Sequence, residues 1–558
     1  MIPSILYLRG YLANDFYSSS TENTPYALAA QLLSSLIPVR GDSFLVAYST
    51  LSVLFLAFST YLNVILCIFL VKYLLSIRTP SDCPILYWKK YRYLITVYFA
   101  FLFAPPPFID RLFTLNPTIF STFAKGFFVA EWTYPVRASL NPTGISDLII
   151  VFTILFSLTQ YFRKNIRVTS YASYFVPFIL FFVSTLLHPV IPIIGLGLLL
   201  TIFILNCTAF LGRIDLIGRR YWMRVFFFCS LGWSLAIVVI LKAFPQPFLS
   251  PNDFFQIYVV DRHPHHYLPS YYLFRNRKSI VLPLLNIAFL LLSVRFAGRF
   301  KLASLLRSIA LLALSVLLAV HLSQYILVEV LRLDLFIGLG ISRASSLFNL
   351  LYVCWFAILL ICCLEYIDIR INPKLIESSM IKMVALLSWA RALQKGILIL
   401  IIAVICAILL LLNSIYTQRF IISDESRLLS RAINSPGIVS NREIVLVKSL
   451  SGRFKFIREI GLLNVYSDLY FPFSKGHVLE YGSRRKKTSE LLDCIESKGV
   501  IKSCVADSKI SNPLLLVSNS SYTDIELYKK VVIGNESIYL YPVNSLNTSV
   551  IEKLNSAN

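Results

Sequence analysis

The chain has 558 residues, of which 57% are hydrophobic and only 15% are charged, and its mean hydropathy is +0.71. An ordinary soluble protein is about 45–50% apolar and about 25% charged, so this composition excludes a soluble enzyme and a disordered chain. The 52 Lys and Arg residues exceed the 29 Asp and Glu residues by 23, and the position of this excess along the chain decides whether it indicates nucleic acid binding.

Ten segments are long and apolar enough to cross a bilayer, because a hydrocarbon core of about 30 Å needs about 20 apolar residues in a helix. In chain order they are 50–76, 93–108, 146–162, 170–187, 190–211, 225–243, 280–297, 308–330, 346–366 and 396–415. Pro105, Pro106 and Pro107 end the second segment early, because proline interrupts a helix. The chain offers no amphipathic helices to surround ten buried ones. The sequence therefore predicts a polytopic membrane protein.

Basic residues gather in alternate loops between these segments. Five mostly short loops hold 20 Lys and Arg residues, whereas the other loops are longer in total and hold about half as many. Lys and Arg are retained on the cytoplasmic side, so we expect both termini to lie outside the cytoplasm. The loops expected on that outer side are 1–49, 105–145, 188–189, 244–279 and 331–345. The excess positive charge is then a signal of topology, and we expect no nucleic acid partner.

The first residues lack the basic start and the small-residue cleavage site of a signal peptide. An outward-facing N-terminus without a preceding span is difficult to insert into a membrane. We therefore interpret Ile2 to Leu12 as the tail of a helix that starts upstream.

Residues 416–558 are polar enough to form a separate small domain beside a membrane domain of residues 1–415. Its apolar runs predict strands at 443–447, 514–517 and 537–541 and helices at 425–433 and 489–496. We expect a small α/β domain outside the cytoplasm. An oxidising compartment would permit a disulfide between Cys494 and Cys504, and two free thiols are the alternative. The basic run 482–487 is typical of a solvated face, with docking to anionic lipid head groups as the alternative.

The stretch from Asp261 to Tyr267, in the 244–279 loop, places three of the six histidines within four residues. Three interpretations stay open. The histidines and the neighbouring cations can contact a phosphate group. With a carboxylate from another loop they can bind a metal ion, although Pro264 makes a site of three histidines sterically poor. They can also form hydrogen bonds within the loop and nothing more.

Few carboxylates lie in the loops expected on the outer side. Asp15 precedes a predicted interfacial helix at 25–36, and Asp110 and Glu131 belong to the second outer loop. Most surface acids are simply solvated. An acid that a folded loop desolvates can instead serve as a general base.

Charge within the predicted spans is almost absent, apart from His321, Glu329 and Arg332 in the outer third of one span. Intramembrane charge is costly and usually marks a transport path. The sequence contains no mid-bilayer series of acids and no pair of inverted halves. A pump or an ion-coupled transporter is disfavoured for that reason.

These features together resemble the GT-C superfamily of polytopic membrane glycosyltransferases, which use polyprenyl-phosphate-linked sugars. The Asn-Asp-Phe-Tyr sequence at 14–17, with the helix at 25–36, is similar to the first outer loop of that superfamily. The Arg-His-Pro-His-His-Tyr-Leu-Pro stretch at 262–269 is similar to that of a bacterial group of GT-C-like membrane proteins. The segments 437–440 and 451–455, with the late strand, are similar to the tail domain of the same group.

The resemblance implies an inverting transferase of the bacterial inner (plasma) membrane that moves a sugar from a polyprenyl-phosphate carrier to an outward-facing acceptor in the cell envelope. Asp15 would be the general base, and Asp110 and Glu131 would bind the acceptor or a divalent cation. The residues that would hold the phosphate leaving group are Arg262, His263, His265, His266, Tyr267, Arg332 and Arg343. A polysaccharide polymerase or ligase, and a non-catalytic flippase or assembly protein, are the alternatives.

Overall fold

The computed structural model describes thirteen continuous stretches of the chain and several isolated residues. The stretches are 41–78, 142–163, 172–207, 216–244, 250–262, 302–333, 344–370, 424–433, 443–447, 477–508, 514–525, 529–533 and 536–543. The isolated residues lie at 31, 35, 91–92, 95–96, 98–99, 268, 270, 287–292, 294–295, 336–337, 450, 510 and 527. The chain divides into two compact units, which are 1–50 with 243–257 and 414–558, and 51–242 with 258–413.

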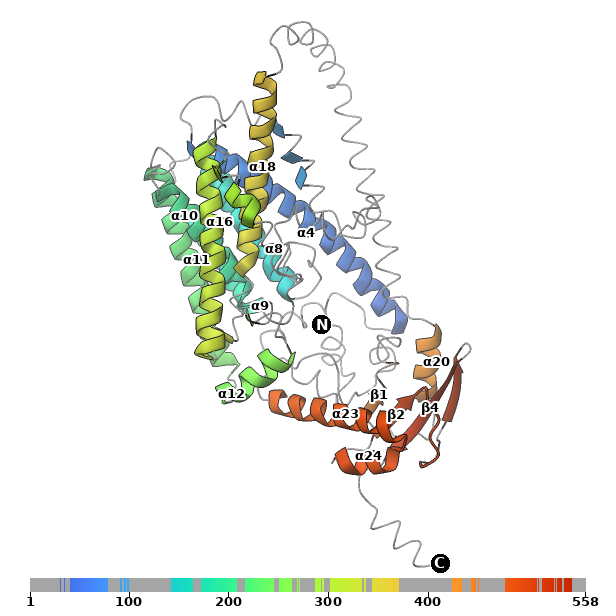
Figure 1. Ribbon diagram of the computed structural model, residues 1–558. Helices are drawn as coiled ribbons and strands as arrows, with labels where there is room; N and C mark the ends of the chain where they lie inside the picture. The colour runs from blue at the N-terminus through green and yellow to red at the C-terminus, as the bar shows by residue number, and fades with distance from the viewer. Residues whose placement is uncertain are drawn as a thin grey trace, which may run out of the picture. The chain divides into compact units, whose positions relative to one another are not determined.

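Long apolar helices make up the described part of the larger unit (Figure 1). The α-helices are α4 (Gly41–Arg78), α8 (Pro142–Phe162), α9 (Ala172–Leu187), α10 (Ile191–Cys207), α11 (Leu216–Ala243), α16 (Ala303–Gln324) and α18 (Ser345–Arg370). Two π-helical segments, η3 (Phe255–Arg262) and η5 (Tyr325–Val330), accompany them, and η5 continues directly from α16.

Four helices among the described residues are long and apolar enough to cross a membrane. They are Thr50–Ser76, Pro142–Phe162, Gly218–Ala243 and Ala303–Val330. Three shorter apolar helices, Ser173–Leu187, Ile191–Cys207 and Leu347–Cys363, coincide with further predicted spans. The remaining predicted spans, 93–108, 280–297 and 396–415, lie wholly or partly outside the described residues. The chain is mostly helical with four candidate spans, and the expected number of ten goes beyond what the structure describes.

The helices pack in pairs, α8 on α9 and α16 on α18, and α10 packs against α8 and α18. Some of the polar groups inside this packing form hydrogen bonds between neighbouring helices, which offsets the cost of burying them. The hydroxyls of Ser146 and Ser184 lie 2.7 Å apart between α8 and α9, and the Tyr221 hydroxyl donates to the Ser157 carbonyl at 2.8 Å. These bonds fix which helix faces meet, because a slip along either helix would leave the polar atoms unpaired.

Helix α11 leaves large apolar side chains exposed along its length. Phe227, Leu231, Leu235, Val238 and Leu241 are between 46% and 66% exposed. A water-facing helix seldom presents such a row. The pattern is what a lipid-facing helix needs, and it agrees with the predicted span at 225–243.

The described part of the C-terminal region is a small α/β domain, as expected. Its elements are α20 (Asp424–Ile433), β1 (Glu443–Leu446), α23 (Val478–Lys498), α24 (Ile501–Ser508), β2 (Leu514–Ser518), β3 (Lys529–Ile533) and β4 (Glu536–Val543). The strands form one sheet in the order β1-β2-β4-β3, in which only the β1–β2 pair is parallel.

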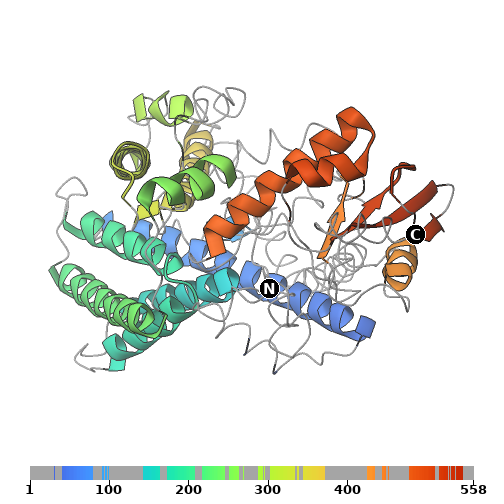
Figure 2. The same cartoon turned by 90° about the horizontal axis from the view of Figure 1, so that it is seen from below.

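Helices cover both faces of this sheet (Figure 2). Alternate residues of a strand point to opposite faces. Leu515 and Val517 accordingly pack with Leu429 of α20, whereas Leu514 and Leu516 pack with α23 and α24. All five residues of β2 are buried, which explains its uninterrupted apolar sequence.

Candidate functional site

Most of the residues expected to act on a substrate lie outside the described residues. These are Asp15, Asp110, Glu131, His263, His265, His266, Tyr267 and Arg343. Arg262 is described as the last backbone residue of η3, and Arg332 is described fully. The described geometry is therefore that of the segments on either side of the histidine stretch and of the residues that contact them.

Two π-helical segments are present among the described residues, and one of them directly precedes this stretch. Segment η3 ends at Arg262, immediately before His263, and η5 carries Glu329. π-Helical turns are well under 1% of residues in globular proteins and are frequent at functional sites. Their positions therefore favour the 258–270 loop and the end of η5 as a functional region.

A hydrogen bond joins these two parts of the chain. The backbone N–H of Ser270 donates to Oε2 of Glu329 at 3.4 Å, which is long for such a bond. Ser270 follows His266 by four residues. Glu329 of η5 thus contacts the backbone of Ser270, three residues after the end of the histidine stretch.

Arg332 holds an unusual backbone conformation just after η5. Its φ is 51°, and it is the one non-glycine residue with positive φ among the described residues. Around it, Leu331 donates to the Ile326 carbonyl and Leu333 to the Leu327 carbonyl, both at 2.9 Å. Glycine normally occupies this position after a helix, because a Cβ atom there costs about 1 kcal/mol. An arginine that retains such strain is a candidate for a function that needs its side chain.

The loop that follows α11 begins with a segment that packs on the C-terminal domain. The short helix α12 (Pro251–Phe254) and Ile257 lie against α23, within the same compact unit. A Cβ atom placed on Gly482 would lie 3.0 Å from Cδ1 of Ile257. This contact could not be predicted from the sequence, because neither residue belongs to a recognisable motif.

This contact constrains the topology. The 251–257 segment directly follows α11, so the predicted topology has to place the C-terminal domain and the start of the 244–279 loop on the same side of the membrane. A shared side requires an even number of crossings between residues 257 and 424. The four spans predicted in that interval, 280–297, 308–330, 346–366 and 396–415, meet this requirement.

Some side chains of the basic run at 482–487 form ion pairs and hydrogen bonds within the C-terminal domain. Arg484 is only 11% exposed and pairs with Glu443 at 2.7 Å and with Glu480 at 2.6 Å. Burial lowers the pKa of Arg484, but the hydrogen bonds and charges of the two glutamates outweigh it and raise the pKa overall. The Arg485 guanidinium donates to the Tyr481 hydroxyl at 3.3 Å, and Lys486 is exposed. The buried Arg484 therefore joins α23 to β1, and only part of the run forms a solvated face.

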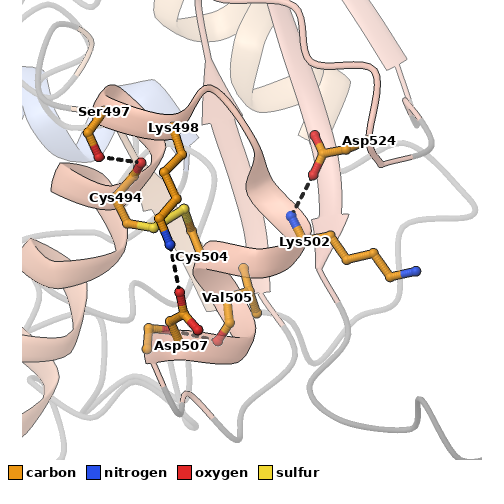
Figure 3. The surroundings of a disulfide bond; sticks show 9 residues. Cys494, Ser497, Lys498, Lys502, Cys504, Val505, Asp507 and Asp524 are labelled. Carbon is orange, nitrogen blue, oxygen red and sulfur yellow. Dashed lines mark hydrogen bonds and ion pairs between the residues drawn. A yellow bond between two sulfur atoms is a disulfide. The ribbon is translucent and has the colours of Figure 1, made fainter.

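Cys494 and Cys504 form a disulfide between α23 and α24 (Figure 3). The described cysteines of the apolar helices, such as Cys67 and Cys354, are free. Beside the disulfide, Lys498 pairs with Asp507 at 3.0 Å, and the Lys502 backbone N–H donates to Asp524 at 2.6 Å. Disulfides persist in oxidising compartments, so this bond agrees with a domain outside the cytoplasm.

Several charged residues inside the predicted spans, including Lys72, Asp147 and Lys242, were overlooked in the sequence. Asp147 in α8 lines a cavity in the helix bundle, although charge within the spans was expected to be almost absent. Its position at the start of a predicted span was visible in the sequence, but the helices that surround it were not. Among the described residues, no group of three His, Cys, Asp or Glu side chains is arranged to hold a metal ion.

Comparisons of the chain with protein-family models, with curated proteins and with solved structures give no match.

Proposed function

We propose that the chain is a membrane-embedded transferase that moves a sugar from a polyprenyl-phosphate carrier to an acceptor on the outer side of the bacterial plasma membrane. The observation that carries the proposal is Arg332, a cation in a glycine-type conformation at the end of η5. It stands three residues after Glu329, which contacts the loop that bears the histidines. A cation held at that place suits the phosphate of a lipid carrier, which lies at the membrane boundary.

The proposed reaction uses residues of several outer loops. Asp15 accepts the proton of the acceptor hydroxyl, whose oxygen attacks the anomeric carbon of the sugar. The bond from that carbon to the phosphate oxygen breaks, and the polyprenyl phosphate leaves with the electron pair. The residues that stabilise the leaving charge are Arg262, His263, His265, His266, Tyr267, Arg332 and Arg343. Asp110 and Glu131 bind the acceptor or a divalent cation.

The outward placement rests on the C-terminal domain. Its disulfide suits an oxidising compartment, and the 251–257 segment ties the start of the histidine-bearing loop to the same side. Lipid carriers present their sugars at that boundary, and both the carrier and the membrane lipids are the expected partners.

Binding of the carrier tests the proposal without knowledge of the sugar. The full-length protein in lipid nanodiscs is titrated with a polyprenyl monophosphate and, as a control, with the corresponding polyprenol that lacks phosphate. We expect preference for the phosphate, a loss of about 10-fold or more for Arg332→Ala and for Arg332→Gly, and near-normal binding for Arg332→Lys. Equal binding of phosphate and alcohol would contradict the proposal.

Transfer of a lipid-linked sugar tests the chemistry. Asp15→Asn keeps the size of the side chain but removes the base, and we expect it to lower the rate by roughly 100-fold or more. Carrier binding should stay unchanged in this variant. A normal transfer rate would exclude Asp15 as the base, and carrier binding with no transfer in the wild type would favour a flippase or an assembly protein.

A further inference from the structure

Asp147 lies in the second turn of α8 and lines a cavity of about 30 Å³ between α4, α8, α10 and α18. The rest of the lining is apolar and includes Leu66 from α4, Ile150 from α8, Ile191 and Ile194 from α10, and Leu347 and Leu350 from α18. A space of this size is large enough for one water molecule, which needs about 10–15 Å³ and at least two polar partners. The two oxygens of the Asp147 carboxylate are the side-chain partners that the lining offers. The carboxylate is the one charged group among the lining residues.

Asp147 differs from the other polar residues of α8. Ser146, Thr153 and Ser157 all form hydrogen bonds within the bundle. Among the described residues, no group donates a hydrogen bond to Asp147 and no cation pairs with it. Lys72 of α4 and His188 of the α9–α10 turn do not line the cavity, and neither do the described tyrosines and cysteines of the surrounding helices.

The cavity is bounded by close packing. A Cβ atom on Gly195 would lie 2.6 Å from Cγ2 of Ile150 and 3.0 Å from Cζ of Phe181. Helices α8, α9 and α10 therefore already meet as closely as their side chains permit at this level. Among the described residues, the space beside Asp147 lies next to this close helix contact.

Three helices begin beside the cavity. Asp147 is near the start of α8, Ile191 is the first residue of α10, and Leu347 is the third residue of α18. The three helices therefore run in the same direction, and their N-terminal ends, which carry partial positive charge, lie near one carboxylate. In the predicted topology this end of the bundle faces the outer aqueous phase, which can supply protons and water.

We propose that Asp147 is a proton-binding site inside the membrane domain, with one water molecule held beside its carboxylate. A hard metal cation takes six or more oxygen ligands, whereas the described lining offers a single carboxylate. Protonation adds H⁺ from the outer phase to the carboxylate and needs no other reactant. This site is separate from the proposed transferase residues and does not depend on that function.

The two protonation states require different surroundings. An ionised carboxylate in a bilayer costs several kcal/mol unless it is hydrated or paired, so it needs the water and the helix ends. The neutral acid tolerates the apolar walls. Proton binding therefore changes how α8 packs against α10 and α18, and this gives the helix bundle a response to the pH of the outer side.

Infrared difference spectroscopy of the full-length protein in nanodiscs tests the site. Spectra are recorded across a pH titration on wild type, on Asp147→Asn and on Asp253→Asn, which removes an exposed carboxylate. We expect one protonated-carboxyl band that titrates in wild type, that is lost in Asp147→Asn and that persists in Asp253→Asn. A wild-type difference spectrum that Asp147→Asn leaves unchanged would overturn the proposal.

A second variant retains the carboxylate and alters its surroundings. Leu347→Phe enlarges a side chain in the opposite wall and should displace the water. We expect the midpoint of the carboxyl band to shift by roughly one pH unit in this variant, because hydration of the charged form changes. An unchanged midpoint would show that the cavity does not surround the titrating group, and the proposal would fail.

Discussion

The side chain of Ile257 packs directly on the backbone of Gly482, so that a Cβ atom at residue 482 would lie 3.0 Å from Cδ1 and 3.2 Å from Cγ1 of the isoleucine. Ile257 belongs to η3, which ends at Arg262, and Gly482 lies within α23. Glycine costs about 1 kcal/mol relative to alanine inside a helix. The close approach of Ile257 is the compensating gain, and it holds the beginning of the histidine-bearing loop on the C-terminal domain.

Replacement of Gly482 by leucine should release this segment. The new side chain cannot fit without displacing Ile257, so we expect faster proteolysis between residues 243 and 257 in the folded protein. Ser483→Leu introduces the same side chain at the adjacent, exposed position and serves as the control. Addition of Ile257→Ala should partly restore protection, because it removes the clash. Equal cleavage rates for Gly482→Leu and Ser483→Leu would contradict the observed contact.

Stability measurements should separate the effect of the backbone conformation of Arg332 from the effect of its side chain. At φ 51° a Cβ atom is unfavourable, so Arg332→Gly should unfold at a higher temperature than Arg332→Ala. The difference should correspond to about 0.5–1 kcal/mol, since the greater freedom of glycine in the unfolded chain offsets part of the gain. Thermal unfolding of the two variants in the same detergent gives the comparison. A more stable alanine variant would show that the positive φ is wrong.

Acid should loosen the start of α23 through His477. Burial lowers the pKa of this histidine below its usual value of about 6.5, Arg484 lowers it further, and Glu480 opposes them. His477 is also the N-cap residue of α23, where a protonated ring would face the positive end of the helix. The unfolded state therefore binds the proton more readily. The stabilising contribution of the neutral ring is complete above about pH 6.5 and is lost as the pH falls through the lowered pKa.

Hydrogen exchange of α23 amides in the full chain measures this effect. We expect protection, after correction for intrinsic exchange, to decrease between about pH 7 and pH 5 in wild type. The decrease should be smaller in His477→Gln, which cannot take up the proton. A steeper loss of protection in the glutamine variant would reverse the sign derived for His477.

The sequence predicted the parts of the fold that depend on local hydrophobic pattern. The spans at 50–76, 146–162, 225–243 and 308–330 coincide with long apolar helices, and β2 was visible as the apolar run 514–517. It missed β3, because a half-exposed edge strand such as Lys-Lys-Val-Val-Ile has little apolar character. It also missed the start of α23 at Val478, since the basic run 482–487 has no apolar period.

The site was less accessible to sequence reasoning for a physical reason. Composition and loop length predict that Arg332 and the histidines face outward, but the positive φ of Arg332 arises from the way η5 ends. Asp147 similarly becomes notable only when α4, α10 and α18 surround it with apolar walls. Asp147 depends on neighbours that are distant in the sequence, and Arg332 depends on local backbone geometry. No recognisable motif encodes either feature.

The disulfide provides a test of both stability and orientation. It closes a loop with a sequence separation of 10 residues, and a loop of that length is worth roughly 2–3 kcal/mol in the chain-entropy account. Cys494→Ser should therefore increase hydrogen exchange in α24, which is joined to α23 through this bond, while Ser497→Ala, beside it, should have little effect.

In intact cells, Cys494 and Cys504 should resist a thiol reagent until a reductant is added, because the outer compartment keeps them oxidised. Free thiols at both positions before reduction would place the domain in the cytoplasm and would remove the outward assignment on which the proposed transferase depends.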